Sequence, residues 1–236
     1  MRHARTLPAM CLAVLAAGAA AAEATEVVLG APGSPAWQLL EFPKIARHTT
    51  YAAVRADGID AIEGHAVCSA SALYIATDAV DLRRTPRLRW QWKIAHGINV
   101  ADERQKAGDD FAARVSIMFR FDASHASFWE NVRHRVGAAL YSTMVPGNTL
   151  NYVWSSRLPA GTTWDNPYDK GTKMISLGRG ALPRWTEALV DVATDYTALF
   201  GAAPPPAVAV AVMTDTDDTC QDATTYYADF RFLSRY

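Results

Sequence analysis

The chain has 236 residues, half of them hydrophobic, with 23 basic and 24 acidic side chains. This composition predicts a packed core and excludes an intrinsically disordered chain. The length allows one large domain or two small ones. The near-neutral charge gives no electrostatic basis for binding nucleic acid.

The first 22 residues have the pattern of a secretory signal peptide. Arg2 and Arg5 precede an apolar run from Leu7 to about Ala19, and Ala20-Ala21-Ala22 fits a cleavage site of small residues. The run is short and rich in alanine for a membrane anchor. We therefore expect a periplasmic or secreted protein that begins near Glu23 and has no membrane span after cleavage.

Two cysteines, Cys68 and Cys220, remain once such a signal is removed. An oxidising compartment favours a disulfide between them, which would tie the first third of the domain to its last hairpin. Two buried free thiols are the alternative, and the sequence leaves both open because it does not give the distance between the α-carbons.

Apolar and polar residues alternate along much of the chain. In the segment 86–95 the apolar side chains Leu88, Trp90, Trp92 and Ile94 share one face, and the segment 111–121 alternates in the same way. Such alternation predicts half-buried β-strands. The same logic predicts strands at 50–56, 71–76, 138–144, 150–156, 173–179, 207–214 and 224–232.

Clusters of Gly, Pro, Asp and Asn separate these segments, which favours a β-sandwich or barrel. One region differs: we expect a strand near 184–190 followed by a short helix near 192–200, with Gly201 at the position after the helix. We see no linker that divides the chain, so the sequence predicts a single, mainly β domain from about residue 35 to 236 with one or two short helices.

Common enzyme motifs are absent, and the histidines are too scattered to suggest a zinc site. The clearest candidate site is the acidic stretch Asp215-Thr216-Asp217-Asp218-Thr219. Its three carboxylates, Asp215, Asp217 and Asp218, are hard oxygen ligands that suit Ca²⁺, although the spacing is not that of an EF-hand. The alternative is an ordinary hairpin turn, since Asp and Thr bond readily to nearby backbone.

A second acidic pair, Asp109 and Asp110, precedes the predicted strand that carries Arg114. Because Asp110 and Arg114 are four residues apart, an extended backbone would place them on one face as an ion pair. If this turn meets the 215–218 stretch, Asp110 with Asp217 or Asp218 could act as an acid and base pair. The alternative is a turn with a structural salt bridge.

Aromatic residues give another functional indication. The chain has seven tryptophans, most of which must lie in the core, but Trp154 with Tyr152, and Trp164 with Tyr168, stand near segments rich in loops. Exposed aromatic rings stack on the apolar faces of sugars while polar side chains bind the hydroxyls. Ordinary core packing is the alternative for each of these rings.

Several motifs in this order resemble the DUF3047 family of bacterial proteins: GDDFAARV at 108–115, LNYVWSS at 150–156, NPY at 166–168, DYTALFG at 195–201, and VMTDTDDT at 212–219 followed by YYADFRF. The resemblance extends from about Trp37 to Phe232. It implies a jelly-roll-like β-sandwich similar to carbohydrate-binding sandwiches. Because the function of the family is unknown, the resemblance assigns no catalytic residue to this chain. Family members tend to carry an Arg-Asn pair where this chain has ALVDV at 188–192, so a site that uses the pair would be altered here.

These observations favour an exported sandwich that binds a saccharide or another cell-envelope ligand without chemistry. The candidate ligand-binding residues are Asp109, Asp110, Arg114 and Trp154, and the candidate Ca²⁺ ligands are Asp215, Asp217 and Asp218. A polysaccharide hydrolase or lyase that uses the carboxylate pair is the second hypothesis. A structural envelope protein whose acidic stretch only orders a hairpin is the third.

Overall fold

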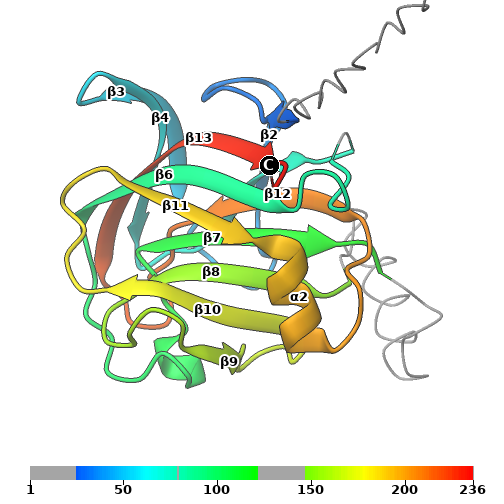
Figure 1. Ribbon diagram of the computed structural model, residues 1–236. Coiled ribbons are helices and arrows are strands. Elements are labelled where there is room, and N and C mark those ends of the chain that lie inside the picture. Colours follow the sequence, from blue (N-terminus) through cyan, green and yellow to red (C-terminus); the bar gives the residue numbers. More distant parts are fainter. Residues whose placement is uncertain (1–24, 79, 122–146, 236) are drawn as a thin grey trace, which may run out of the picture.

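The computed structural model describes residues 25–78, 80–121 and 147–235. The predicted signal peptide and the predicted strand at 138–144 lie outside these residues. Two β-sheets pack face to face, and one helix lies at the side of the sandwich (Figure 1). The prediction of a mainly β, jelly-roll-like sandwich is therefore confirmed, with one α-helix in the described part of the chain.

The first sheet runs in the order β11-β6-β13-β4-β3, and β1 also pairs with β13. Its strands are β11 (Thr186–Asp191), β6 (Arg87–His96), β13 (Asp222–Leu233), β4 (Ile59–Val67), β3 (Thr50–Ala56) and β1 (Glu26–Val28). The second sheet runs in the order β2-β5-β12-β7-β8-β10-β9. Its strands are β2 (Trp37–Leu40), β5 (Ala72–Ala76), β12 (Ala207–Met213), β7 (Ala113–Phe119), β8 (Thr149–Ser155), β10 (Thr172–Arg179) and β9 (Thr163–Asp165).

The core lies between the two sheets, where the alternating pattern predicts it. Leu88, Trp90 and Trp92 on β6 are fully buried, and β7 contributes Val115 and Ile117 from the opposite sheet. Burial of such large apolar side chains contributes about 1.5–3 kcal/mol each relative to exposure. The inward face of β6 is thus the one that the sequence indicates.

Strand β7 differs from the prediction of a half-buried strand, because its second face is buried too. Arg114 and Ser116 point away from the core between the sheets, yet both are buried. A small apolar cluster of Phe111, Val153, Met174 and Trp164 covers this outer face near one end of the strand. Phe111 comes from the segment before β7 and Trp164 from β9, whereas Val153 and Met174 lie on β8 and β10.

The segment that alternates less regularly forms the predicted strand and helix. Strand β11 leads directly into α2 (Val192–Phe200). The Asp191 side chain accepts a hydrogen bond from the backbone N–H of Thr194, and Gly201 ends the helix with a left-handed φ of 72°. No helix in the described ranges is long and apolar enough to cross a membrane.

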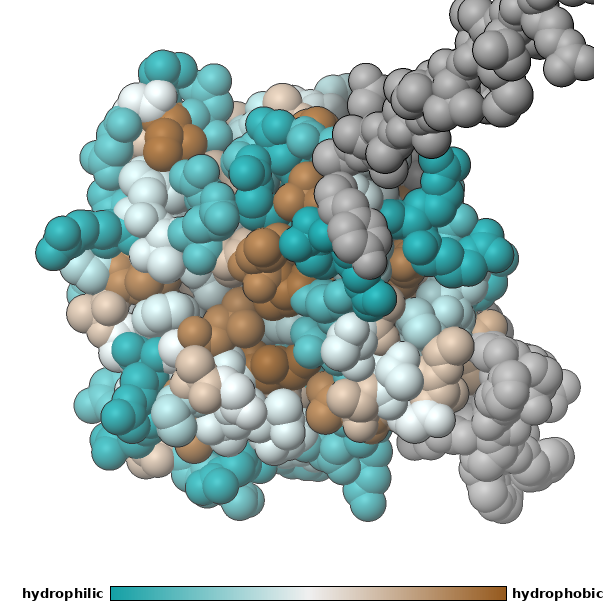
Figure 2. Space-filling view, viewed as in Figure 1, coloured by the Kyte–Doolittle hydropathy of each residue, from teal (hydrophilic) through white to brown (hydrophobic). Residues whose placement is uncertain are grey.

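The side of the sandwich beside α2 exposes apolar groups. Figure 2 shows hydrophobic side chains gathered toward the middle of the same view, surrounded by hydrophilic ones. Strand β11, which lies on this side in Figure 1, carries Leu189, which is about half exposed (49%). Scattered exposed apolar residues are common on soluble proteins and do not by themselves indicate a site.

Candidate functional site

The two acidic stretches of the sequence meet at one end of the second sheet. Strands β7 and β12 are antiparallel neighbours, and Met213 at the end of β12 pairs with Arg114 near the start of β7. The residues just before β7 and just after β12 therefore lie side by side. This pairing brings together five carboxylates, which we call the acidic cluster: Asp109, Asp110, Asp215, Asp217 and Asp218.

Arg114 is the buried cation of the acidic cluster. Its Nη2 donates to Asp215 Oδ2 at 2.7 Å and to the Asp109 backbone oxygen at 2.9 Å, and it lies 3.7 Å from Asp109 Oδ1. Its guanidinium also stacks over the Phe111 ring, 4.8 Å from the centroid. The predicted ion pair between Asp110 and Arg114 is thus wrong, because β7 begins only at Ala113 and the backbone before it is not an extended strand.

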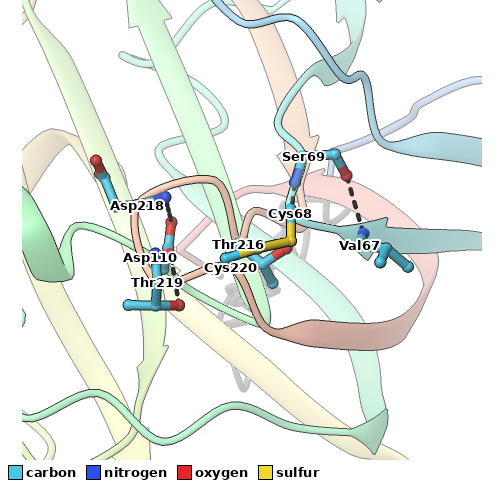
Figure 3. Close-up of a disulfide and its surroundings, with 8 residues drawn as sticks. All are labelled: Val67, Cys68, Ser69, Asp110, Thr216, Asp218, Thr219 and Cys220. Atoms are coloured by element: carbon cyan, nitrogen blue, oxygen red, sulfur yellow. Dashed lines mark hydrogen bonds between the residues drawn. A yellow bond between two sulfur atoms is a disulfide. The ribbon is translucent and has the colours of Figure 1, made fainter.

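Asp110 instead anchors the acidic stretch that follows β12. Its carboxylate accepts hydrogen bonds from the backbone N–H of Asp218 and from both the N–H and the hydroxyl of Thr219. Figure 3 shows these groups around the carboxylate, next to the disulfide between Cys68 and Cys220. The disulfide that the sequence left open is therefore formed, and it ties the end of this stretch to β4.

The preceding residues of the stretch are held on both sides. The Asp215 N–H donates to the Phe111 oxygen, and the Thr216 N–H donates to the Ser69 oxygen. The Thr216 hydroxyl accepts a hydrogen bond from the Ser69 N–H, also visible in Figure 3. The Thr216 hydroxyl thus bonds to backbone 147 residues away in sequence, and the Thr219 hydroxyl bonds to the Asp110 carboxylate. These two threonines join separate segments instead of making the local backbone bonds that the turn interpretation predicts.

Three of these carboxylates are close enough to share a cation. One oxygen each from Asp110, Asp215 and Asp217 lie within 4.8 Å of one another. Asp218, which the sequence predicted as a metal ligand, is not in this group, and Asp110 takes its place. Asp215 is 1% exposed, and its Oδ1 has no hydrogen-bond partner among the described residues. Hard carboxylate oxygens at this density fit Ca²⁺.

Burial dominates the electrostatics of the acidic cluster. It raises the pKa of Asp215 well above the usual carboxylate value, and Arg114 opposes this only in part. Burial also raises the pKa of Asp109, although the Arg114 guanidinium acts in the opposite direction. The pKa of Asp217 is raised by burial and by the negative charge of Asp110. Burial alone would lower the pKa of Arg114, but the charges of Asp215 and its neighbours raise it. A bound cation would reduce the repulsion among these buried carboxylates.

Tyr168 forms the exposed edge of this region, and the sequence indicates it only as an aromatic residue near loops, not as one of the candidate site residues. It is 56% exposed, the most exposed aromatic side chain among the described residues. Its hydroxyl donates to Asp218 Oδ1 at 2.8 Å and lies 3.2 Å from the Lys106 backbone oxygen. We call residues 106–110, 166–168 and 217–219 together the loop end. The NPY motif at 166–168 was a signal for it, but nothing in the sequence showed that it meets the acidic stretch.

Asn166 and Asp109 connect Tyr168 to the acidic cluster from the buried side. The Asn166 amide donates to Asp109 Oδ2 at 2.8 Å, and its Oδ1 accepts from the Tyr168 N–H at 2.9 Å. Burial raises the pKa of Asp218, and the hydrogen bond from Tyr168 opposes that shift. The exposed ring is therefore attached to the buried carboxylates by two short hydrogen-bonded routes.

Trp154 lies apart from these residues. It pairs across the ladder with Ala113, whereas Arg114 pairs with Val153, so Trp154 and Arg114 point to opposite faces of the second sheet. The Trp154 ring packs edge-on against the buried Trp92 at 6.0 Å, and its indole N–H donates to the Gly180 oxygen. The structure thus brings together six of the seven predicted site residues and separates Trp154 from them.

The acidic cluster does not line the cleft found in the described residues. That cleft has a volume of about 900 Å³ and is formed by residues 80–84, 86, 193, 204–206, 234 and 235. Asp110 is fully buried, and its carboxylate already accepts three hydrogen bonds. Asp217 and Asp218 are half-buried beside it.

The family described as "Protein of unknown function (DUF3047)" matches residues 35–231. The chain belongs to the DUF3047 family. No curated protein matches this DUF3047 chain.

Solved structures that resemble this DUF3047 protein are distant. The family 11 carbohydrate-binding module from Clostridium thermocellum in complex with a β-1,3-1,4-mixed-linked tetrasaccharide is 7% identical, with a TM-score of 0.45 over 89% of this chain and 95% of that chain. The family 11 module of the cellulosomal cellulase Lic26A-Cel5E of the same organism is 8% identical, with a TM-score of 0.46 and the same coverage.

A cellulase derived from the Cel12A enzyme of Rhodothermus marinus is 12% identical, with a TM-score of 0.42 over 89% of this chain and 100% of that chain. Likenesses at this level transfer no residue and no activity to the DUF3047 protein. Its function has to be argued from its own loop end and acidic cluster.

Proposed function

We propose that this protein is an exported, single-domain β-sandwich that binds a saccharide at the loop end without catalysis. The observation that carries the proposal is Tyr168, an exposed aromatic ring (56%) whose hydroxyl is fixed by Asp218. A tyrosine presents an apolar face together with a polar edge, which suits the stacked face and the hydroxyls of a sugar ring.

The other groups divide into contacts and supports. Asp217 and Asp218 are half-buried and next to the exposed ring, so they are placed to accept hydrogen bonds from sugar hydroxyls. Asp109, Asp110 and Arg114 are buried and act in this proposal as supports that fix the backbone of the loop end. Trp154 is left out of the proposed contact surface because it faces the core between the sheets.

Ca²⁺ is the proposed cofactor. We assign it to Asp110, Asp215 and Asp217, whose oxygens lie within 4.8 Å of one another, rather than to the Asp215, Asp217 and Asp218 set predicted from the sequence. The unpartnered Oδ1 of buried Asp215 supports this assignment, because a buried carboxylate oxygen without a partner is costly and a cation would satisfy it.

The geometry gives less support to a hydrolase or lyase. A carboxylate pair needs an open cleft in which both groups reach the substrate. Asp110 is fully buried and accepts three hydrogen bonds, so it is not placed to exchange a proton with a polysaccharide. Saccharide recognition requires only that the exposed side of the loop end meets the ligand.

Export follows in this proposal from the signal-peptide pattern of residues 1–22 and from the disulfide between Cys68 and Cys220. Expression of the full chain in a Gram-negative host, followed by N-terminal sequencing of the periplasmic fraction, checks it. A mature N-terminus near Glu23 is expected, and an uncleaved chain in the cytoplasm would contradict it.

The binding proposal is tested with a glycan array followed by calorimetry on the mature protein, in buffers with and without CaCl2. We expect at least one saccharide to bind wild type, and Tyr168→Ala to weaken that binding by tenfold or more. Leu189→Ala is the matched control, since it also removes an exposed large apolar side chain but lies on β11. Equal losses in both variants, or no binding by wild type in either buffer, would refute the proposal.

A further inference from the structure

The cation site and the exposed ring share one short segment of chain. Asp217 contributes an oxygen to the group with Asp110 and Asp215, and the next residue, Asp218, accepts the Tyr168 hydroxyl at 2.8 Å. The Asp218 N–H also donates to the Asp110 carboxylate at 3.2 Å. A change in the position of Asp217 would therefore move Asp218, the next residue, and with it the carboxylate that accepts the Tyr168 hydroxyl.

The ends of this segment are fixed, so any adjustment is confined to its middle. On one side, Asp215 and Thr216 are buried and bonded to the backbone of Phe111 and Ser69. On the other side, Cys220 is bonded to Cys68. Residues 217–219 are half-buried, and Asp218 and Thr219 are hydrogen-bonded to the Asp110 carboxylate, so the position of this part depends on the charge around Asp110.

The charges of the region are unbalanced. Five carboxylates form the acidic cluster, and Arg114 is the cation that pairs with them, at Asp215 and at Asp109. Asp217 and Asp218 have no such partner among the described residues and lie beside Asp110. Like charges at short range repel one another, and this repulsion is strong where burial excludes water. A cation bound by Asp110, Asp215 and Asp217 would reduce this repulsion and hold the Asp217 carboxylate close to Asp110.

We propose that Ca²⁺ bound by Asp110, Asp215 and Asp217 is thermodynamically coupled to saccharide binding, through the Asp217–Asp218 peptide and the hydrogen bond between Asp218 and Tyr168. The proposal rests on the proposed function and adds the regulation of its site. The cation holds Asp217 toward Asp110, Asp218 then holds the Tyr168 hydroxyl, and the ring is presented in one orientation. Coupling between two sites is reciprocal. If Ca²⁺ raises the affinity for the saccharide, the saccharide must raise the affinity for Ca²⁺ by the same factor.

The first arm of the test measures Ca²⁺ alone, by calorimetry on the mature, disulfide-bonded protein. Tyr168→Phe keeps the ring and removes only the hydroxyl that bonds to Asp218. We expect this variant to bind Ca²⁺ several-fold more weakly than wild type, because the coupled contact is lost. Asp60→Asn, a change at an exposed carboxylate on β4 outside the acidic cluster, is the control that should match wild type. Equal Ca²⁺ affinities in Tyr168→Phe and wild type, or no Ca²⁺ binding by wild type, would overturn the coupling.

The second arm measures saccharide affinity with CaCl2 and with EDTA. Coupling between sites typically changes an affinity by about 5- to 150-fold. We expect a gain within this range for wild type and a smaller gain for Tyr168→Phe. The same gain in both proteins would overturn the coupling while leaving saccharide binding intact. Weaker Ca²⁺ binding by Tyr168→Phe in the first arm, without any saccharide binding in the second, would refute the proposed function and with it the coupling to a saccharide, while the link between the cation site and Tyr168 would stand.

Discussion

At the scale of single residues, Arg114 determines whether the acidic cluster can be buried. Its guanidinium contacts Asp215 and the backbone and carboxylate of Asp109, and all three residues are buried. A buried ion pair adds little net stability compared with apolar residues, but removing one partner leaves an uncompensated charge. The main role of Arg114 is therefore to stabilise the fold around the acidic cluster, where its hydrogen bond holds Asp215 in place.

Substitution Arg114→Met should reduce the free energy of unfolding by about 3–5 kcal/mol, because it strands the Asp215 and Asp109 carboxylates in a buried site. Urea denaturation at pH 7 without Ca²⁺ gives the value. The double variant Arg114→Met/Asp215→Asn should recover part of the loss, since one stranded charge is gone. A single-variant loss below about 1 kcal/mol would contradict the role assigned to Arg114.

Asp195 in α2 gives a prediction of pH dependence far from the proposed site. Its Oδ2 accepts a 2.8 Å hydrogen bond from the buried Tyr152 hydroxyl, and burial raises its pKa above the usual 3.8 despite that bond. The folded state thus holds the Asp195 proton more tightly than the unfolded chain does. The contribution of this group to stability is least favourable above its folded pKa and improves as the pH falls toward 3.8.

Asp195→Asn should therefore gain stability relative to wild type at pH 7, and the difference should shrink as the pH is lowered to 4.5. Urea denaturation of both proteins across this range measures it. The control is Asp60→Asn, at an exposed carboxylate. A difference that stays constant, or that grows on acidification, would show that burial of Asp195 does not dominate its titration.

At the scale of elements, the sequence predicts most strands but not their partners. Alternation locates β3, β5, β6, β8, β10, β12 and β13 to within two residues, because buried and exposed side chains alternate along an extended backbone. The sequence did not predict strand β4. Its buried positions include the small residues Ala61, Gly64 and Ala66, which give a weak alternation of apolar and polar side chains. The pairing of β7 with β12, about a hundred residues apart, depends on tertiary packing and is not encoded in either strand alone.

Gly178 in β10 shows how a single residue shapes a neighbouring strand. A Cβ at this position would lie 2.2 Å from the Trp154 ring, so the glycine leaves the space in which the indole packs. Gly178→Ala should destabilise the fold by about 1–3 kcal/mol through overpacking. Gly97→Ala is the matched control, because its nearest neighbour would be 3.4 Å away. Similar thermal unfolding of the two variants would contradict the packing described for Trp154.

The disulfide fixes the acidic stretch to β4 across 152 residues of sequence. Closing so long a loop in the unfolded chain corresponds to about 4–5 kcal/mol if chain entropy dominates. The double variant Cys68→Ser/Cys220→Ser should lose stability of this order in urea denaturation, and wild type treated with a reductant should lose the same amount. A loss below about 1 kcal/mol would mean that the remaining hydrogen bonds of the stretch suffice to hold it.

At the scale of the whole molecule, the acidic cluster lies at one end of the second sheet and the core lies between the two sheets. The sequence predicted the sandwich, the buried face of β6, the helix and the acidic residues, because each depends on local pattern. It indicated Tyr168 only as one of several aromatic residues near loops, since exposure depends on what surrounds a ring. The ion pair that it suggested between Asp110 and Arg114 is not formed, because the strand begins later than the pattern indicates. Both differences concern the loop end, where irregular backbone replaces alternation.

The most direct test of the account is hydrogen–deuterium exchange of the mature protein with and without a saturating saccharide, at saturating Ca²⁺. Segments that contact the ligand should exchange more slowly. The account predicts protection at 106–110, 166–168 and 217–219, and none at 80–86 and 204–206, which line the cleft elsewhere on the molecule. Protection confined to that cleft or to the outer face of the first sheet would contradict the assignment of the loop end as the binding site.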